Sequence, residues 1–138
     1  MFQLRIYTLR SAEALERYAA VHWARHIPSL ATFGVTTHGI WTQRGEDDHR
    51  LVALISYPDG ADPTALTGEF MASPEFAADM DGFDPEDIVA VDSMLLDPTP
   101  SSPLKPRKAA NVNLATRESG FARFTLGGPQ GVGSGGAP

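Results

Sequence analysis

The sequence predicts an α+β domain in which four strands form an antiparallel sheet and helices cover one face of that sheet. Three features support this fold class. Short strand-like segments occur at both ends of the region that precedes about residue 98. A long amphipathic segment follows the first of them. Two more strand-like segments are joined by a short polar turn, which is typical of a β-hairpin.

The first strand and the first helix are predicted next to each other at the start of the chain. Phe2–Leu9 is short, contains Leu, Ile, Tyr and Thr, and ends at a polar step. Ser11 then caps the helix, and Glu13 lies in its first turn, where the helix dipole favours a carboxylate. The helix runs to about Ile27. Pro28 ends it, kinks it or opens a further helical turn.

The middle of the chain is predicted to form a hairpin and then two short helices. The hairpin strands are Val35–Gln43 and Leu51–Tyr57, and the polar, glycine-containing segment Arg44–His49 is the turn between them. The short helices are predicted over Ala65–Met71 and over Pro74–Met80, where the proline suits a first helical position.

The last strand is predicted over Ile88–Leu96, which completes the order β-α-β-β-α-β of ferredoxin-like folds. Both helices then lie on one face of the sheet and leave the other face uncovered. The last strand is apolar on both of its sides, so the uncovered face is partly apolar, which usually indicates a partner. We expect a homodimer in which two sheets pair face to face as a dimeric α+β barrel.

Composition divides the chain into a domain, residues 1–98, and a Pro/Gly-rich, largely disordered tail, residues 99–138. Residues 1–97 carry 6 Arg and 16 Asp or Glu, whereas residues 98–138 carry 5 Lys or Arg and one Glu. An acidic domain repels phosphate backbones, so no nucleic-acid partner is expected. There is no cysteine, no signal-peptide pattern and no apolar run that could span a bilayer. A cytoplasmic protein is expected.

Two histidines on the long helix are the main candidates for a functional site. At about 100° per residue, His22 and His26 lie on the same side as the apolar residues of this helix. Burying an imidazole without a partner is costly, so the pair suggests a lined cavity. His26 is the stronger candidate for a general acid or base, because imidazole titrates near physiological pH. The alternatives are a structural His26, bonded to a backbone carbonyl that Pro28 frees, and a partly exposed His22.

Arg5 and Tyr7 point to one side of the first strand, because strand side chains alternate. Together they can bind an enolate or a carboxylate, the arginine through its charge and the tyrosine through its hydroxyl. The alternative pairs Arg5 with Asp92 and packs Tyr7 in the core. Tyr18 and Trp41 are predicted to be core residues or walls of a substrate pocket.

His-x-x-x-His on a helix is also a spacing for two metal ligands. No Asp or Glu lies on the same side of this helix, so a metal site would need His38 or His49 as well. We expect no metal and no cofactor; a divalent metal, or haem bound by one histidine of the pair, is the alternative. No serine elbow, phosphate loop or dinucleotide fingerprint occurs.

Several short motifs follow one another in a specific order. They are Leu4–Leu9 (Leu-Arg-Ile-Tyr-Thr-Leu), His26–Pro28, Gly39–Thr42, Tyr57, Ser73–Phe76, Leu95–Leu96 and Pro98. In this order they resemble the NIPSNAP family over about residues 2–98. The resemblance implies a dimeric α+β barrel. Related barrels include monooxygenases, polyketide cyclases, isomerases and haem proteins, so the resemblance selects no reaction.

The chain departs from the family pattern in the third strand. Many members carry a histidine there and an aromatic residue two positions later, whereas this chain has Ala53 and Ile55. One interpretation is that His22 and His38 are this protein's own substitutes.

The sequence favours a small cofactor-independent enzyme that performs acid/base chemistry on a hydrophobic carbonyl or aromatic small molecule, by isomerisation, cyclisation or oxygenation. One alternative is a non-catalytic binding or interaction protein that uses the tail as a contact arm, and another is a haem- or metal-binding barrel. The residues of the favoured site are His26 and His22 for proton exchange, Arg5 and Tyr7 for the negative oxygen, and Tyr18, Trp41 and His38 for substrate binding.

Overall fold

The structure, a computed structural model, describes residues 1–45 and 48–105. The chain divides into two units, Met1–Thr99 and Pro100–Pro138. The predicted disordered tail lies mostly outside the described residues, since nothing after residue 105 belongs to them. Every strand and helix of the described residues belongs to the first unit.

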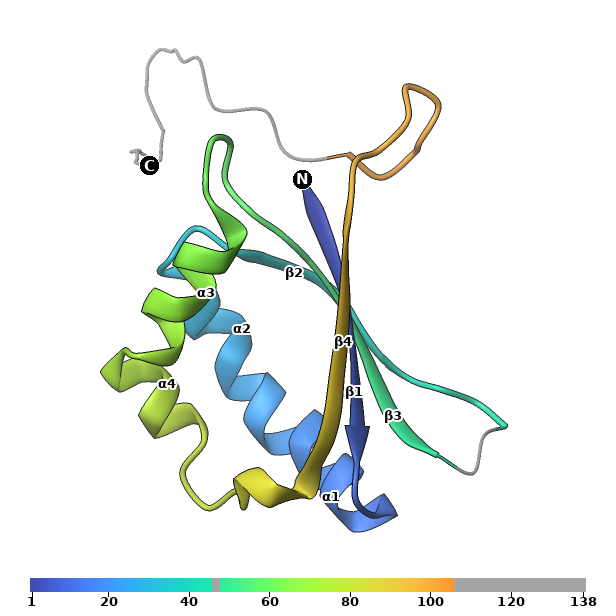
Figure 1. Ribbon diagram of the computed structural model, residues 1–138, viewed down its shortest axis with the longest axis vertical. Helices are drawn as coiled ribbons and strands as arrows, with labels where there is room; N and C mark the ends of the chain where they lie inside the picture. Colours follow the sequence, from blue (N-terminus) through green and yellow to red (C-terminus); the bar gives the residue numbers. More distant parts are fainter. Residues whose placement is uncertain (46–47, 106–138) are drawn as a thin grey trace. The chain divides into compact units, whose positions relative to one another are not determined.

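The first unit has the predicted α+β architecture. Its elements, in chain order, are β1 (Phe2–Leu9), α1 (Ala12–Arg17), the π-helix η1 (Tyr18–His22), α2 (Trp23–Ala31), β2 (Thr36–Thr42), β3 (His49–Ser56), α3 (Pro63–Met71), α4 (Pro74–Asp79), the 3₁₀-helix η2 (Pro85–Asp87) and β4 (Ile88–Leu96). The strands form one antiparallel sheet in the order β2-β3-β1-β4. The helices α2, α3 and α4 lie on one side of this sheet (Figure 1). This is the predicted ferredoxin-like arrangement. No helix in the described part of the chain is long and apolar enough to cross a membrane.

The long helical segment begins as predicted and differs in its middle and at its end. The Ser11 hydroxyl accepts a hydrogen bond from the backbone N–H of Ala14 at 3.0 Å and so caps α1. A single π turn, η1, then separates α1 from α2. Pro28 does not end the helix but lies within α2. Isolated π turns inside α-helices often lie at functional sites.

Strand register determines which side chains face the helices. On β1, Arg5 lies opposite Ala53 and Tyr7 lies opposite Leu51, and this set of alternating residues points toward the helices. Leu51, Ala53 and Ile55 have no exposed surface. Ala53 and Ile55 are therefore core positions on the helix side of the sheet.

Within residues 1–45 and 48–105, no helix covers the opposite face of the sheet, and this open face is partly apolar as predicted. Trp41, Met94 and Leu96 are 53%, 52% and 38% exposed. The indole ring of Trp41 lies directly over Gly39, so a Cβ on that residue would overlap the ring.

Candidate active site

A cavity of about 440 Å³ lies between the helices and the sheet, a volume in the usual range for small-molecule sites. Met71 on α3 and Val91 on β4 line it and are 57% and 52% exposed, so they mark its mouth. Trp23 and Leu30 on α2 line its buried end. Of the site residues predicted from the sequence, those that line the cavity are Arg5, Tyr7, Tyr18 and His26.

His26 forms a buried pair with Asp79, the last residue of α4. The Nδ1 atom of His26 lies 3.0 Å from Oδ2 of Asp79, and the two residues are 3% and 6% exposed. A carboxylate only accepts hydrogen bonds, so Nδ1 carries the proton and donates it. Nε2 is then the nitrogen with a free lone pair, and it is the one available to a ligand in the cavity.

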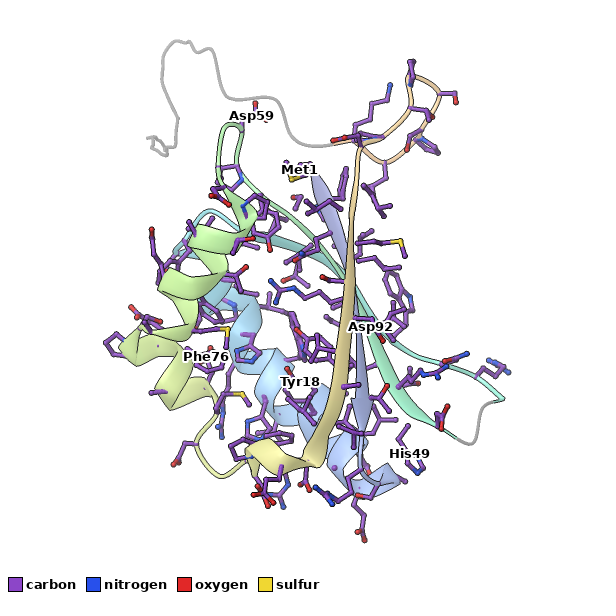
Figure 2. The ribbon with its side chains drawn as sticks, viewed as in Figure 1. Met1, Tyr18, His49, Asp59, Phe76 and Asp92 are labelled. Atoms are coloured by element: carbon purple, nitrogen blue, oxygen red, sulfur yellow. The ribbon has the colours of Figure 1, made fainter. Side chains whose placement is uncertain are left out.

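The surroundings of His26 favour its neutral form. Burial lowers the pKa of His26 below its usual value, and the hydrogen bond and charge of Asp79 offset this only in part. The ring of Phe76 stacks on the imidazole with centroids 5.6 Å apart and an angle of 1° between the planes. Figure 2 shows Phe76 on α4 and Tyr18 on the long helical segment, both on the helix side of the sheet. At neutral pH, His26 is therefore poised as a base.

Four side chains of the long helical segment hold Asp79 in place. His22 Nδ1 donates to the Asp79 backbone carbonyl at 2.8 Å, and Arg25 donates to the same carbonyl at 3.1 Å. The Ser29 hydroxyl donates to Oδ1 of the carboxylate at 3.0 Å, while His26 bonds Oδ2. These four donors are spaced i, i+3, i+4 and i+7, which places them on one side of the segment. They fix the end of α4 and the direction of its carboxylate.

His22 is a structural histidine that bonds the backbone carbonyl of Asp79. The alternative of a partly exposed His22 is therefore wrong, and the alternative of a His26 bonded to a carbonyl that Pro28 frees is not what the structure has, since His26 bonds the Asp79 side chain. His22 is 1% exposed, does not line the cavity, and its Nε2 atom has no hydrogen-bond partner among the described residues. The predicted pair of cavity histidines is therefore reduced to one, because the two rings bond different atoms of Asp79.

Arg5 lines the cavity with a guanidinium that is bonded only to neutral groups. It donates to two other residues of β1, to Oε1 of Gln3 at 2.8 Å and to the hydroxyl of Tyr7 at 3.3 Å. It also donates to the Tyr57 hydroxyl at 2.9 Å and to the Thr67 hydroxyl at 3.0 Å. Within the described part of the chain no carboxylate forms an ion pair with it.

The alternative that paired Arg5 with Asp92 is wrong. Arg5 lies opposite Ser93 in the β1–β4 pair, whereas Asp92 lies opposite Ile6. Because neighbouring residues on a strand point to opposite faces, the Asp92 side chain is on the open face of the sheet. Asp92 is labelled on β4 in Figure 2.

The charge states of the other polar groups follow from burial and neighbours. Burial lowers the pKa of Arg5, but Tyr7 and Tyr57 outweigh it and hold the pKa above its usual value. Burial, followed by the neighbouring Tyr7, raises the pKa of Tyr18 far above its usual value. Arg5 is therefore a permanent cation, and Tyr18 is a neutral wall of the cavity.

Two predicted substrate-binding residues lie outside this cavity. Trp41 belongs to the open face of the sheet. His38 bonds the Ser56 hydroxyl through Nε2 at 2.8 Å, and its ring lies 5.0 Å from that of Phe2. Neither His38 nor His22 therefore takes the place of the missing strand histidine in this cavity.

The metal alternative finds no third ligand. In residues 1–45 and 48–105, no group of three or more His, Cys, Asp or Glu side chains could hold a metal ion. His38 and His49 do not join His22 and His26 to form such a group.

Sequence reasoning missed several residues of the site, and three of them carried a usable signal. Asp79 interrupts an apolar pattern three residues after Phe76 and one before Met80, which is the same kind of signal that singled out the histidines. Tyr57 continues the inward-facing alternation of β3. Gln3 lies two residues before Arg5 on the same side of β1, so strand alternation could have suggested it, whereas Thr67 contacts Arg5 only through the tertiary fold.

Comparison with known proteins agrees with this fold. The NIPSNAP family profile matches residues 2–103, and no curated protein matches the chain significantly. A NIPSNAP family protein of unknown function from Agrobacterium tumefaciens is 17% identical, with a TM-score of 0.61 over 75% of this chain and 91% of its own. An uncharacterized NIPSNAP-like domain protein from Burkholderia xenovorans is 22% identical, with a TM-score of 0.59 over 76% of this chain and 90% of its own. The fold and the profile match together show that the chain belongs to the NIPSNAP family.

Proposed function

We propose that this NIPSNAP family protein is a cofactor-independent enzyme that moves a proton next to a carbonyl group, or on an electron-rich ring, of a hydrophobic small molecule. The observation that carries the proposal is the buried Asp79–His26 pair at the wall of the cavity. A carboxylate that fixes the tautomer of an imidazole, and stabilises its protonated form, is a recurrent arrangement for general acid/base catalysis.

In the proposed step, Nε2 of His26 takes a proton from the carbon beside a carbonyl. The electrons of the broken C–H bond move toward the carbonyl oxygen and form an enolate, and the imidazolium is stabilised by Asp79. Returning the proton to a different carbon isomerises the substrate, while attack of the enolate on an electrophilic carbon of the same molecule cyclises it. His26 acts alone in this step, and His22 acts indirectly by fixing Asp79.

Arg5 and Tyr7 are proposed to hold the negative oxygen. The four hydrogen bonds of Arg5 use four of the five N–H groups of a guanidinium, and they leave one on Nη1, the atom that also bonds Tyr7. The Tyr7 hydroxyl accepts from Arg5 and keeps its own proton to donate. Two donors beside each other suit an oxyanion that forms as the C–H bond breaks.

We also propose that the protein works as a homodimer in the cytoplasm. The apolar open face of the sheet, with Trp41 and Met94 half exposed, supports a second copy as the partner. The cysteine-free sequence is compatible with a reducing compartment.

The proposed chemistry is tested by solvent deuterium exchange. The protein is incubated in D₂O with a panel of aryl ketones and aryl keto acids, and loss of the α-proton signals is followed by proton NMR. We expect the wild-type protein to accelerate exchange of at least one of them, and His26→Gln to abolish the acceleration. Arg10→Gln is the matched control, because the Arg10 side chain is 59% exposed, pairs with Asp87 and does not line the cavity.

Circular dichroism and thermal melting of each variant show whether it is folded. Wild-type protein that accelerates none of the exchanges would overturn the proposal, as would a folded His26→Gln variant with wild-type rates.

A further inference from the structure

We infer that the cavity is built for a hydrophobic monoanion, whose carboxylate or ionised enol oxygen pairs with Arg5 while its apolar body extends toward His26. This rests on the proposed function, because it names the substrate class of the same cavity. It goes further in one respect: the negative charge is on the ligand before any proton moves.

The first argument is the missing counter-ion of Arg5. The guanidinium is bonded by one amide oxygen and three hydroxyls, and none of these groups carries charge. The buried carboxylate of Asp79 pairs with His26 and not with Arg5. Charges away from bulk water are normally paired. An anionic ligand would supply the partner that the chain does not.

The second argument is the chain's own charge. The sequence has a formal net charge of −6, and the partly buried Arg50 pairs with Asp48, whereas the partly buried Arg5 has no carboxylate partner among the described residues. The cavity lining, as far as the structure describes the chain, contains no Asp or Glu, and Asp79, which lies behind His26, is occupied by His26 and Ser29. The cavity therefore offers a ligand one permanent cation and no free anion among the described residues.

The third argument is the separation of polar and apolar lining. Gln3, Thr67 and Ser93 line the cavity together with Arg5 and form its polar part. Phe70 and Phe76 line it beside His26, with ring centroids at 5.6 Å from the imidazole in both cases. An anion with an aromatic or alicyclic body matches both parts at once, whereas a neutral hydrocarbon leaves the polar part unused.

The test compares an acid with its neutral amide. Binding of 2-naphthoate and 2-naphthamide, which have nearly the same shape, is measured by calorimetry and by ligand-observed NMR at pH 7.5. We expect the acid to bind at least ~10-fold more tightly, since a charge-assisted hydrogen bond is roughly twice as strong as a neutral one. Added salt should weaken the binding of 2-naphthoate and leave the binding of 2-naphthamide unchanged.

Variants of Arg5 test whether this residue causes the preference for the acid over the amide. Arg5→Gln should bind acid and amide equally, and Arg5→Lys should keep part of the preference because it keeps the charge. Arg10→Gln is the matched control: Arg10 is 59% exposed, pairs with Asp87 and does not line the cavity. It should bind both probes as the wild type does.

Equal binding of acid and amide by the wild type would overturn the inference, and this result needs no variant. A folded Arg5→Gln protein that still prefers the acid would also overturn it. The outcome is separate from the proposed chemistry, because naphthoate has no exchangeable α-proton. Selective acid binding without deuterium exchange would overturn only the proposed function, and exchange of neutral ketones without acid preference would overturn only this inference.

Discussion

Replacing Asp79 by Asn tests the reasoning about the site most directly. The change keeps the size of the side chain and removes only its charge. It alters the group that lies 3.0 Å from His26 Nδ1 and leaves the donors to the Asp79 backbone carbonyl, His22 and Arg25, in place. Any effect on His26 therefore comes from the lost negative charge or from the amide that replaces it.

The expected magnitude follows from the hydrogen bond that is weakened. A bond to a charged partner contributes ~1.5–3 kcal/mol and a neutral one ~0.5–1.5 kcal/mol, so the protonated form of His26 loses roughly 1–2 kcal/mol of stabilisation. Since 1.36 kcal/mol is a factor of ten in rate, we expect deuterium exchange to slow by about 10-fold or more. The same loss should lower the pKa of His26 further, in the direction in which burial already shifts it.

Two measurements check this prediction on the same sample. Exchange rates are compared in the wild type, Asp79→Asn and Ser29→Ala, and long-range proton–nitrogen NMR reports which ring nitrogen of His26 carries the proton as pH is varied. Ser29→Ala should keep the Nδ1–H tautomer, because Asp79 stays charged. An Asp79→Asn protein that exchanges at the wild-type rate and titrates like the wild type would refute the role given to Asp79.

Three further predictions concern stability and assembly. Because the folded-state pKa of His26 is below its unfolded value of about 6.5, the unfolded chain binds the proton first as pH falls. The free energy of unfolding should therefore decrease from pH 6.5 downward to the folded pKa, and His26→Gln should flatten this decrease in urea titrations at each pH. Met94→Glu places a charge on the open face of the sheet and should shift the mass measured by light scattering from dimer to monomer, whereas a wild-type monomer would contradict the proposed dimer. Gly39→Ala should displace the indole of Trp41 and change its fluorescence at little cost in stability, because the overlapping atoms are the far end of a side chain that is 53% exposed; an unchanged emission spectrum would count against the contact.

Most of the fold could be predicted from the sequence, because the local signals for each element agreed with the order of elements along the chain. The Ser11 cap, the glycine-containing hairpin turn and the β-branched strands each specify an element without help from the rest of the chain. The open apolar face could be anticipated because a β-α-β-β-α-β order puts both helices on one side. The π turn η1 carried no such signal, since Tyr18–His22 has an ordinary helical composition.

The site was only half predictable. Polar residues on an apolar helix side indicated that His22 and His26 have partners, but periodicity cannot say which partner each ring finds. That depends on where α4 ends, and Asp79 is 53 residues away from His26 in the chain. The role of Arg5 was open because alternation along one strand does not say which residue of the neighbouring strand lies opposite. The register places Ser93 opposite Arg5 and puts Asp92 on the other face of the sheet.

The π turn also determines how this helix can change over evolution. One turn of π-helix contains about one residue more than a turn of α-helix, so removing one residue from η1 would restore an ordinary α-helical turn and leave the inward sides of α1 and α2 in phase. A single deletion between Tyr18 and His22 would therefore keep the Ser11 cap of α1 and the four donors to Asp79, and would change only the side chains of the turn itself. A one-residue change of length in η1 would thus alter the packing beside Tyr18 without substituting His26 or any group that holds Asp79.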